Sequence, residues 1–174
     1  MLNYKNILEE LIGKITKSEG VLDFATREKQ AKFENWLQVE LCGVLRKNHT
    51  VTPEKYVNYI REGKQSGNSY DIFLDSTVAI ELKIFTNNGK SGSENVKRVI
   101  KDISKLKDLP GNIVKLEILL VYFITNEEDE RRWNEYRTKI ETGMKSKIEC
   151  LIKSGDFNFK GSKEKGRLYL YKLA

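Results

Sequence analysis

The sequence predicts one mixed α/β domain with a central sheet that helices cover on both faces. Three observations support this fold class: two amphipathic segments precede three short strands, a further helix leads into an almost wholly apolar strand, and the C-terminal tail is rich in strand-forming residues. The chain of 174 residues has the length of one ordinary domain, and no linker or repeat divides it. We therefore expect residues 1–174 to form a single domain.

Two helices are predicted before the first strand. Residues 2–17 carry apolar side chains at helical spacing, and so do residues 27–48. The second helix presents an apolar stripe that we expect to pack against the sheet. This stripe consists of Phe33, Trp36, Leu37, Leu41, Val44 and Leu45.

Three strands are predicted to follow as an antiparallel meander. Residues 51–62 alternate as a strand does, with Pro53 near the start. The polar segment Gly63–Ser69 contains two glycines and is expected to form a loop. The next two strands lie within residues 69–85, "SYDIFLDSTVAIELKIF", and a tight turn at residues 75–77 joins them.

The rest of the chain alternates helices and strands. A second loop, Thr86–Asn95, is rich in turn-forming residues and leads into a helix over residues 94–109. Residues 116–125 are nearly all apolar, which is typical of a central strand covered on both faces. A helix over residues 127–143 begins with acidic residues, as the helix dipole favours, and the tail from residue 146 reads as two or three strands. The expected order is ααβββαβα followed by a β-rich tail.

The charge of the chain favours an anionic partner. A formal net charge of +6 and a pI of about 9.1 point first to nucleic acid and second to an anionic membrane surface. No apolar run has the length of a membrane span, and the first residues lack the apolar core of a signal peptide, so we expect a cytoplasmic protein. The single histidine, His49, and the cysteines Cys42 and Cys150 do not have the spacing of a zinc site.

The two strands within residues 69–85 place three charged residues on one face. If residues 75–77 form the turn, Leu74 faces Val78 and Asp71 lies opposite Glu81. Side chains alternate along a strand, so Glu81 and Lys83 share that face. The other face is uniformly apolar, which fixes the register of the two strands. Its residues are Ile72, Leu74, Val78, Ile80, Leu82 and Ile84.

Two opposed carboxylates repel each other unless a cation lies between them. A hard divalent ion such as Mg²⁺ prefers carboxylate oxygens, a backbone carbonyl and water as ligands. Lys83 lies one alternation step from Glu81 and could orient a bound water or stabilise developing charge. This face is therefore equipped to hydrolyse a phosphodiester. The simpler interpretation, a solvated strand face with an ion pair between Glu81 and Lys83, stays open.

Over residues 32–125 the chain resembles the PD-(D/E)xK nuclease superfamily. The core of that superfamily is a helix, a three-stranded antiparallel meander, a crossover helix and a further strand. Asp71 matches its first metal-binding acid and Glu81-Leu82-Lys83 matches its (D/E)xK motif, whereas Tyr70 stands where the motif's name expects proline. The resemblance implies a restriction-endonuclease-like core and an Mg²⁺-dependent endonuclease, with Mn²⁺ as a substitute.

The resemblance also implies an acid on the helix that precedes the meander. Glu40 is the preferred candidate because it lies beside the apolar stripe, and Glu34 is a weaker one. A rim position for Glu40, paired with Lys47 or Arg46, is the alternative. The expected catalytic residues are Asp71, Glu81, Lys83 and Glu40, and the expected metal ligands are Asp71, Glu81, Glu40 and the backbone carbonyl of Leu82.

Basic residues near the predicted site are candidates for phosphate contacts. Lys97 and Lys101 lie on the crossover helix, in a basic flank that also contains Lys105, and Lys64 and Lys90 lie in the two polar loops. DNA is favoured over RNA as the partner, and a homodimer is expected if the enzyme cuts both strands. Two alternatives stay open: an inactive nucleic-acid-binding or assembly module on the same fold, and a basic α/β domain with a polar sheet face.

Overall fold

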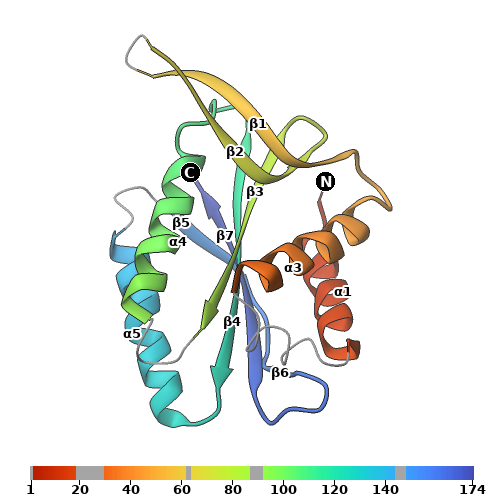
Figure 1. Cartoon of the computed structure of the whole chain (residues 1–174), viewed down its shortest axis with the longest axis vertical. Helices are drawn as coiled ribbons and strands as arrows, with labels where there is room; N and C mark the ends of the chain where they lie inside the picture. Colours follow the sequence, from red (N-terminus) through yellow and green to blue (C-terminus); the bar gives the residue numbers. More distant parts are fainter. Residues whose placement is uncertain (1, 19–29, 62–63, 87–91, 144–147) are drawn as a thin grey trace.

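The computed structural model describes residues 2–18, 30–61, 64–86, 92–143 and 148–174 and shows a mixed α/β fold around one sheet (Figure 1). The strands are β1 (Val51–Arg61), β2 (Lys64–Leu74), β3 (Val78–Thr86), β4 (Val114–Ile124), β5 (Ile148–Lys153), β6 (Phe157–Asn158) and β7 (Lys165–Leu173). Their order in the sheet is β1-β2-β3-β4-β7-β5, with β6 paired to β7. All neighbouring pairs in the described residues are antiparallel except β3 and β4, which are parallel.

Two pairs of helices cover the two faces of the sheet (Figure 1). The helices are α1 (Tyr4–Lys17), α3 (Gln30–Leu45), α4 (Gly92–Leu106) and α5 (Glu127–Gly143). One apolar cluster joins α1 and α3 to one face, and a second joins α4 and α5 to the other. The prediction of a mixed α/β fold is therefore confirmed, including the order of the elements and the helices on both faces of the sheet.

The β2–β3 hairpin has the predicted register. Leu74 pairs with Val78 and Ile72 with Ile80, and the turn occupies residues 75–77. All residues predicted for the apolar face are buried in the cluster beneath α1 and α3. Because β4 continues parallel to β3 after α4, the chain makes a helical crossover, and β4 lies inside the sheet between β3 and β7.

The predicted loop Gly63–Ser69 is wrong from Lys64 onward, because β2 begins at Lys64 and pairs with β1 from there; Gly63 lies outside the described residues. The two strands form a ribbon that projects beyond the rest of the sheet at the top of Figure 1. Solvent reaches most described side chains of β1, so polar residues are tolerated there without an apolar alternation. Gly67 fits this ribbon because a Cβ at this position would lie 2.5 Å from the ring of Tyr56.

The C-terminal tail forms three strands, in agreement with the prediction. β7 pairs with β4 along almost its whole length and carries β5 and β6 on its other edge. Among the described residues, no helix has both the length and the hydrophobicity that a membrane span requires.

Candidate active site

Strand β2 separates from β3 at Asp71, the first acid of the predicted site. The described pairing of the two strands ends at Ile72–Ile80, one residue before Asp71 would meet Glu81. On the other edge of β2, the run of partners with β1 skips Asp71 and Glu54, and Glu54 has a left-handed φ of 49°. Asp71 therefore lies where β2 leaves the sheet and the ribbon begins.

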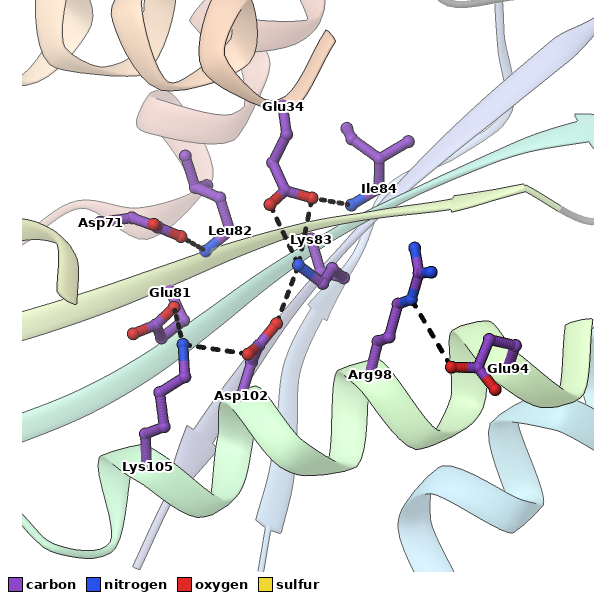
Figure 2. A network of polar contacts seen from close by, with 10 residues as sticks. All are labelled: Glu34, Asp71, Glu81, Leu82, Lys83, Ile84, Glu94, Arg98, Asp102 and Lys105. Atoms are coloured by element: carbon purple, nitrogen blue, oxygen red, sulfur yellow. Dashed lines mark hydrogen bonds and ion pairs between the residues drawn. The ribbon is translucent and has the colours of Figure 1, made fainter. Parts of the chain in front are cut away.

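Two carboxylates bind the main chain of β3 where the partner strand has left (Figure 2). The N–H of Leu82 donates to Oδ2 of Asp71 at 2.7 Å, and the N–H of Ile84 donates to Oε2 of Glu34 at 3.3 Å. The side chain of Gln38 in turn donates to the carbonyl of Asp71 at 2.6 Å. Buried backbone donors need partners, so these contacts fix the two acids against β3.

Glu81 lies beside Asp71, as the sequence predicted. Only 2% of Glu81 is exposed, and its Oε1 has no hydrogen-bond partner among the described atoms. Burial raises the pKa of Glu81 to about 9, and the negative charge of Asp71 adds to the increase. Burial also raises the pKa of Asp71, although the hydrogen bond from Leu82 opposes the increase. The two acids therefore repel each other when both are ionised, and a proton on Glu81 relieves this repulsion through a hydrogen bond to Asp71.

Lys83 lies between two carboxylates that come from opposite sides of the sheet (Figure 2). Its Nζ is 3.0 Å from Oε1 of Glu34 on α3 and 2.8 Å from Oδ2 of Asp102 on α4. Burial alone lowers the pKa of Lys83, but the two carboxylates more than offset burial, so the pKa lies above its ordinary value. Lys83 is therefore a stable cation that can donate hydrogen bonds but does not accept a proton near neutral pH.

A second lysine, Lys105 on α4, also contacts these acids. Nζ of Lys105 lies 3.0 Å from Oδ1 of Asp102 and 3.7 Å from Oε2 of Glu81. The backbone carbonyl of Lys105 accepts a hydrogen bond from the hydroxyl of the buried Tyr70 at 3.1 Å. Tyr70, which replaces the proline of the motif's name, therefore connects the base of the ribbon to α4.

The acids of this group outnumber its bases. Four carboxylates, those of Glu34, Asp71, Glu81 and Asp102, lie near the two ammonium groups of Lys83 and Lys105. If all six were ionised, the group would carry an excess of two negative charges. Isolated charges are costly to bury, so the excess must be balanced by protons or by a bound cation.

A fifth acid lies on the neighbouring strand. Glu117 of β4 is the register partner of Glu81 in the parallel pair of strands. Its side chain has no exposed surface, and neither carboxylate oxygen has a hydrogen-bond partner in the described part of the chain. Burial raises the pKa of Glu117 well above its usual value, with the charge of Glu81 as the second cause.

Three members of the group were not predicted as site residues. Lys105 was assigned only to a basic flank, and Asp102 and Glu117 were overlooked. A signal was present for both acids. Asp102 lies on the buried side of α4, beside Ile103, and Glu117 interrupts an otherwise apolar strand. An acid in such a position needs a partner and marks a candidate site.

The structure does not bring Glu40 to this group. Oε2 of Glu40 lies 3.5 Å from Nζ of Lys14, beside a surface hollow that α1 and α3 line. The expected alternative partner Lys47 binds Glu10 of α1 instead. Glu34 and Glu40 are six residues apart on α3, so they point in different directions around the helix. Of the two acids considered on this helix, Glu34, the weaker candidate from the sequence, is the one that contacts Lys83 and Ile84.

The lysines predicted to contact phosphate lie in different parts of the chain. Lys97 and Lys101 are exposed on α4, and Lys101 is one helical turn from Lys105. Lys64 is the first residue of β2. Lys90 lies outside the described residues.

The donor set of this group fits a hard divalent cation in its chemistry. Asp71 and Glu81 offer carboxylate oxygens, and one oxygen of Glu81 has no hydrogen-bond partner among the residues that the structure describes. The N–H and C=O of a strand residue point to the same edge, so the carbonyl of Leu82 faces the side on which its N–H meets Asp71. Among the described residues, no three acidic, histidine or cysteine side chains already converge to hold a metal ion, so binding requires side chains to rotate.

Comparisons with models of known families, with curated proteins and with solved structures find no match to this chain. The fold and the group define a mixed α/β protein with a buried, acid-rich site. This site lies between α4 and the β2–β3–β4 part of the sheet.

Proposed function

We propose that the protein is a divalent-metal-dependent nuclease of the PD-(D/E)xK type that hydrolyses phosphodiester bonds, with DNA as the favoured substrate. The observation that carries the proposal is the excess of buried and half-buried carboxylates that gather around Asp71 and Glu81, beside the charged Lys83. The order of strands supports a restriction-endonuclease-like core, because an antiparallel meander continues through a helical crossover into a parallel strand.

In this proposal Asp71, Glu81 and the carbonyl of Leu82 would hold Mg²⁺ or Mn²⁺. Glu34, and not Glu40, would be the site's acid from the helix that precedes the meander. The bound ion would neutralise charge on the phosphoryl group and lower the pKa of a bound water. Lys83 remains protonated and donates hydrogen bonds to the attacking water or to a phosphate oxygen. Glu34 and Asp102 hold the ammonium of Lys83 in place.

Two features favour nucleic acid, and duplex DNA in particular, as the substrate. The chain has a net charge of +6, and the exposed Lys97 and Lys101 extend along α4 from the turn that carries Lys105. The ribbon of β1 and β2 starts beside Asp71, and a two-stranded ribbon has dimensions that the major groove of DNA admits. A substrate contacted by both elements would pass over the acid-rich group.

The test is cleavage of single-stranded, duplex and branched DNA, and of RNA, with Mg²⁺ or Mn²⁺. We expect Asp71→Asn, Glu81→Gln and Lys83→Met each to lower the cleavage rate by about 100-fold or more, while circular dichroism shows a folded protein. Glu40→Gln is the matched control, because it removes an acid from α3 that lies outside the group, and it should cut at the wild-type rate. A wild-type protein that cuts none of these substrates would contradict the proposal.

One observation favours a second candidate, an inactive nucleic-acid-binding module on the same fold. Lys105 places an ammonium 3.7 Å from Glu81, and Lys83 contacts two carboxylates, so lysines already balance part of the acid charge. Such a module would bind nucleic acid with strong salt dependence but would gain no thermal stability from Mg²⁺ or Mn²⁺. A rise in the melting temperature with either ion distinguishes the nuclease from the module.

A further inference from the structure

The acid-rich group continues further into the sheet than the proposed metal ligands. Glu81 of β3 is in register with Glu117 of β4, and Glu117 is in register with Tyr171 of β7. Residues on the same face of these strands belong to the cluster beneath α4 and α5, among them Ala79, Leu119 and Tyr169. The three side chains therefore form one row across adjacent strands, with α4 above the Glu81 end.

Each side chain in this row has a buried polar atom without a partner. In the described part of the chain six buried side-chain atoms lack a hydrogen bond, and four of them are Oε1 of Glu81, both carboxylate oxygens of Glu117 and the hydroxyl of Tyr171. Buried polar groups in folded proteins are nearly always bonded to protein, water or an ion. Unpartnered atoms gathered in one row therefore indicate that the row binds something.

The charge of the surroundings favours a cation over water alone. With Glu117, five carboxylates face two ammonium groups, so full ionisation would leave an excess of three negative charges. Water would satisfy hydrogen bonds here but would leave this charge in place, whereas protons would remove the charge but bring no partner to every unpartnered oxygen. A divalent cation balances two of the three charges and also binds the unpartnered oxygens, and a donor set made only of oxygen atoms selects a hard ion such as Mg²⁺ or Mn²⁺.

We propose that Glu117 is a ligand of this divalent ion, on the inner side of Glu81. The inference rests on the proposed function, because it adds one ligand to the same metal site. The carboxylates do not converge as they stand, so Glu117 must rotate toward Glu81 when the ion binds. Within the described segments no hydrogen bond holds either of its oxygens, so this rotation breaks no bond that the structure describes. Asp71, Glu81 and Glu117 would then bind the ion from three adjacent strands.

The test measures Mn²⁺ binding to the full chain by calorimetry and by the rise in melting temperature. Glu117→Gln should weaken Mn²⁺ binding by about ten-fold or more and should reduce the rise in melting temperature. Glu164→Gln is a matched control, because Glu164 also has a buried oxygen without a partner among the described residues but lies outside the row. This control should bind Mn²⁺ as the wild type does.

The possible results separate this inference from the nuclease proposal. Wild-type affinity in Glu117→Gln would overturn the inference, and cleavage by the wild type would still support the nuclease. Mn²⁺ binding that depends on Glu117, in a protein that cuts no nucleic acid, would support the inference and contradict the nuclease. A wild type that binds no Mn²⁺ would overturn both. If Glu117→Gln fails to fold, Glu117→Met also removes the carboxylate, and wild-type Mn²⁺ affinity in that variant would overturn the inference.

Discussion

Two groups of charged residues lie on the α4–α5 face of the sheet, and they differ in how completely their charges are balanced. The guanidinium of Arg167 on β7 donates to Glu130 at 2.8 Å and to Asp156 at 2.6 Å, and Arg167 is only 6% exposed. In the described part of the chain, the group around Glu81 has more acids than bases and keeps buried oxygens without hydrogen-bond partners. We call the first the Arg167 group and the second the Glu81 group.

The pKa directions show the same difference. The hydrogen bond from Arg167 lowers the pKa of Glu130, so that acid is stabilised in its charged form. In the Glu81 group, burial raises the pKa values of Glu81 and Glu117 because too little positive charge lies nearby. An arrangement of the first kind stabilises the fold, whereas one of the second kind lowers stability unless a ligand completes it. The comparison therefore separates a structural ion pair from a candidate binding site.

The largest expected effect is a pH dependence of stability that comes from the Glu81 group. Glu81 has a folded-state pKa of about 9 against an ordinary value of 4.5, so unfolding releases a proton between these values. The contribution of Glu81 to the free energy of unfolding should be highest below pH about 4.5 and should fall as the pH rises toward about 9. One such proton contributes a slope of at most about 1.4 kcal/mol per pH unit.

Urea unfolding from pH 5 to 8 measures this slope. Glu81→Gln should make the slope shallower, and saturating Mg²⁺ should do the same in the wild type, because the ion stabilises the ionised carboxylate. Arg167→Met should keep the wild-type slope, since it alters the balanced group. An unchanged slope in Glu81→Gln would mean that Glu81 is not an uncompensated buried acid.

Next in size is the loss of stability when the Arg167 group is broken. Arg167→Met removes charge-assisted hydrogen bonds to Glu130 and Asp156, which are each about one-third exposed and can reach water. We expect the free energy of unfolding to fall by about 2–3 kcal/mol. Mn²⁺ binding to the folded variant should be unchanged. A variant that loses Mn²⁺ binding while folded would show that the two groups are not independent.

The matched control for this variant is an exposed arginine. A guanidinium nitrogen of Arg131 on α5 lies 3.8 Å from Oε1 of Glu135, and 74% of the Arg131 side chain is exposed. Arg131→Met should therefore change the free energy of unfolding by less than about 1 kcal/mol. Equal effects of the two substitutions would remove the energetic distinction between the buried Arg167 and a surface ion pair.

A smaller effect is expected from the lysine that partly balances the Glu81 group. Nζ of Lys105 lies 3.7 Å from Oε2 of Glu81, and 31% of the Lys105 side chain is exposed, so water screens part of its charge. Its ammonium is the positive charge that an incoming cation would face. Lys105→Met should tighten Mg²⁺ or Mn²⁺ binding by about two- to five-fold, as titration calorimetry can measure. Weaker ion binding in this variant would show that Lys105 assists the ion.

The sequence predicted the parts of this site that depend on local geometry. Alternation along β3 placed Glu81 and Lys83 on one face, and the turn at residues 75–77 fixed Asp71 near Glu81. The polar segment Gly63–Ser69 was misassigned, because a ribbon with solvent around it needs no apolar alternation. Local patterns therefore identified the hairpin and its charged face but not the length of β2.

The rest of the site depends on contacts between segments far apart in the sequence. Glu34 reaches Lys83 because of the direction in which α3 crosses the sheet, which spacing along the helix does not determine. Asp102 reaches Lys83 because α4 packs on the same face. Glu117 lies beside Glu81 because of the parallel register of β3 and β4, which the crossover through α4 sets. These residues had unusual local environments, but tertiary packing decides which of them meet.

The smallest expected effect compares the two acids of α3. Glu40 and Lys14 form a partly exposed ion pair outside both charged groups, so Glu40→Gln should change the free energy of unfolding by less than about 1 kcal/mol. Glu34→Gln instead weakens a contact to Lys83 inside the Glu81 group and should lower both ion binding and cleavage. The two substitutions change the same functional group on one helix and differ mainly in position. If Glu40→Gln impaired Mn²⁺ binding or cleavage more than Glu34→Gln did, the site would have to include the α1–α3 surface.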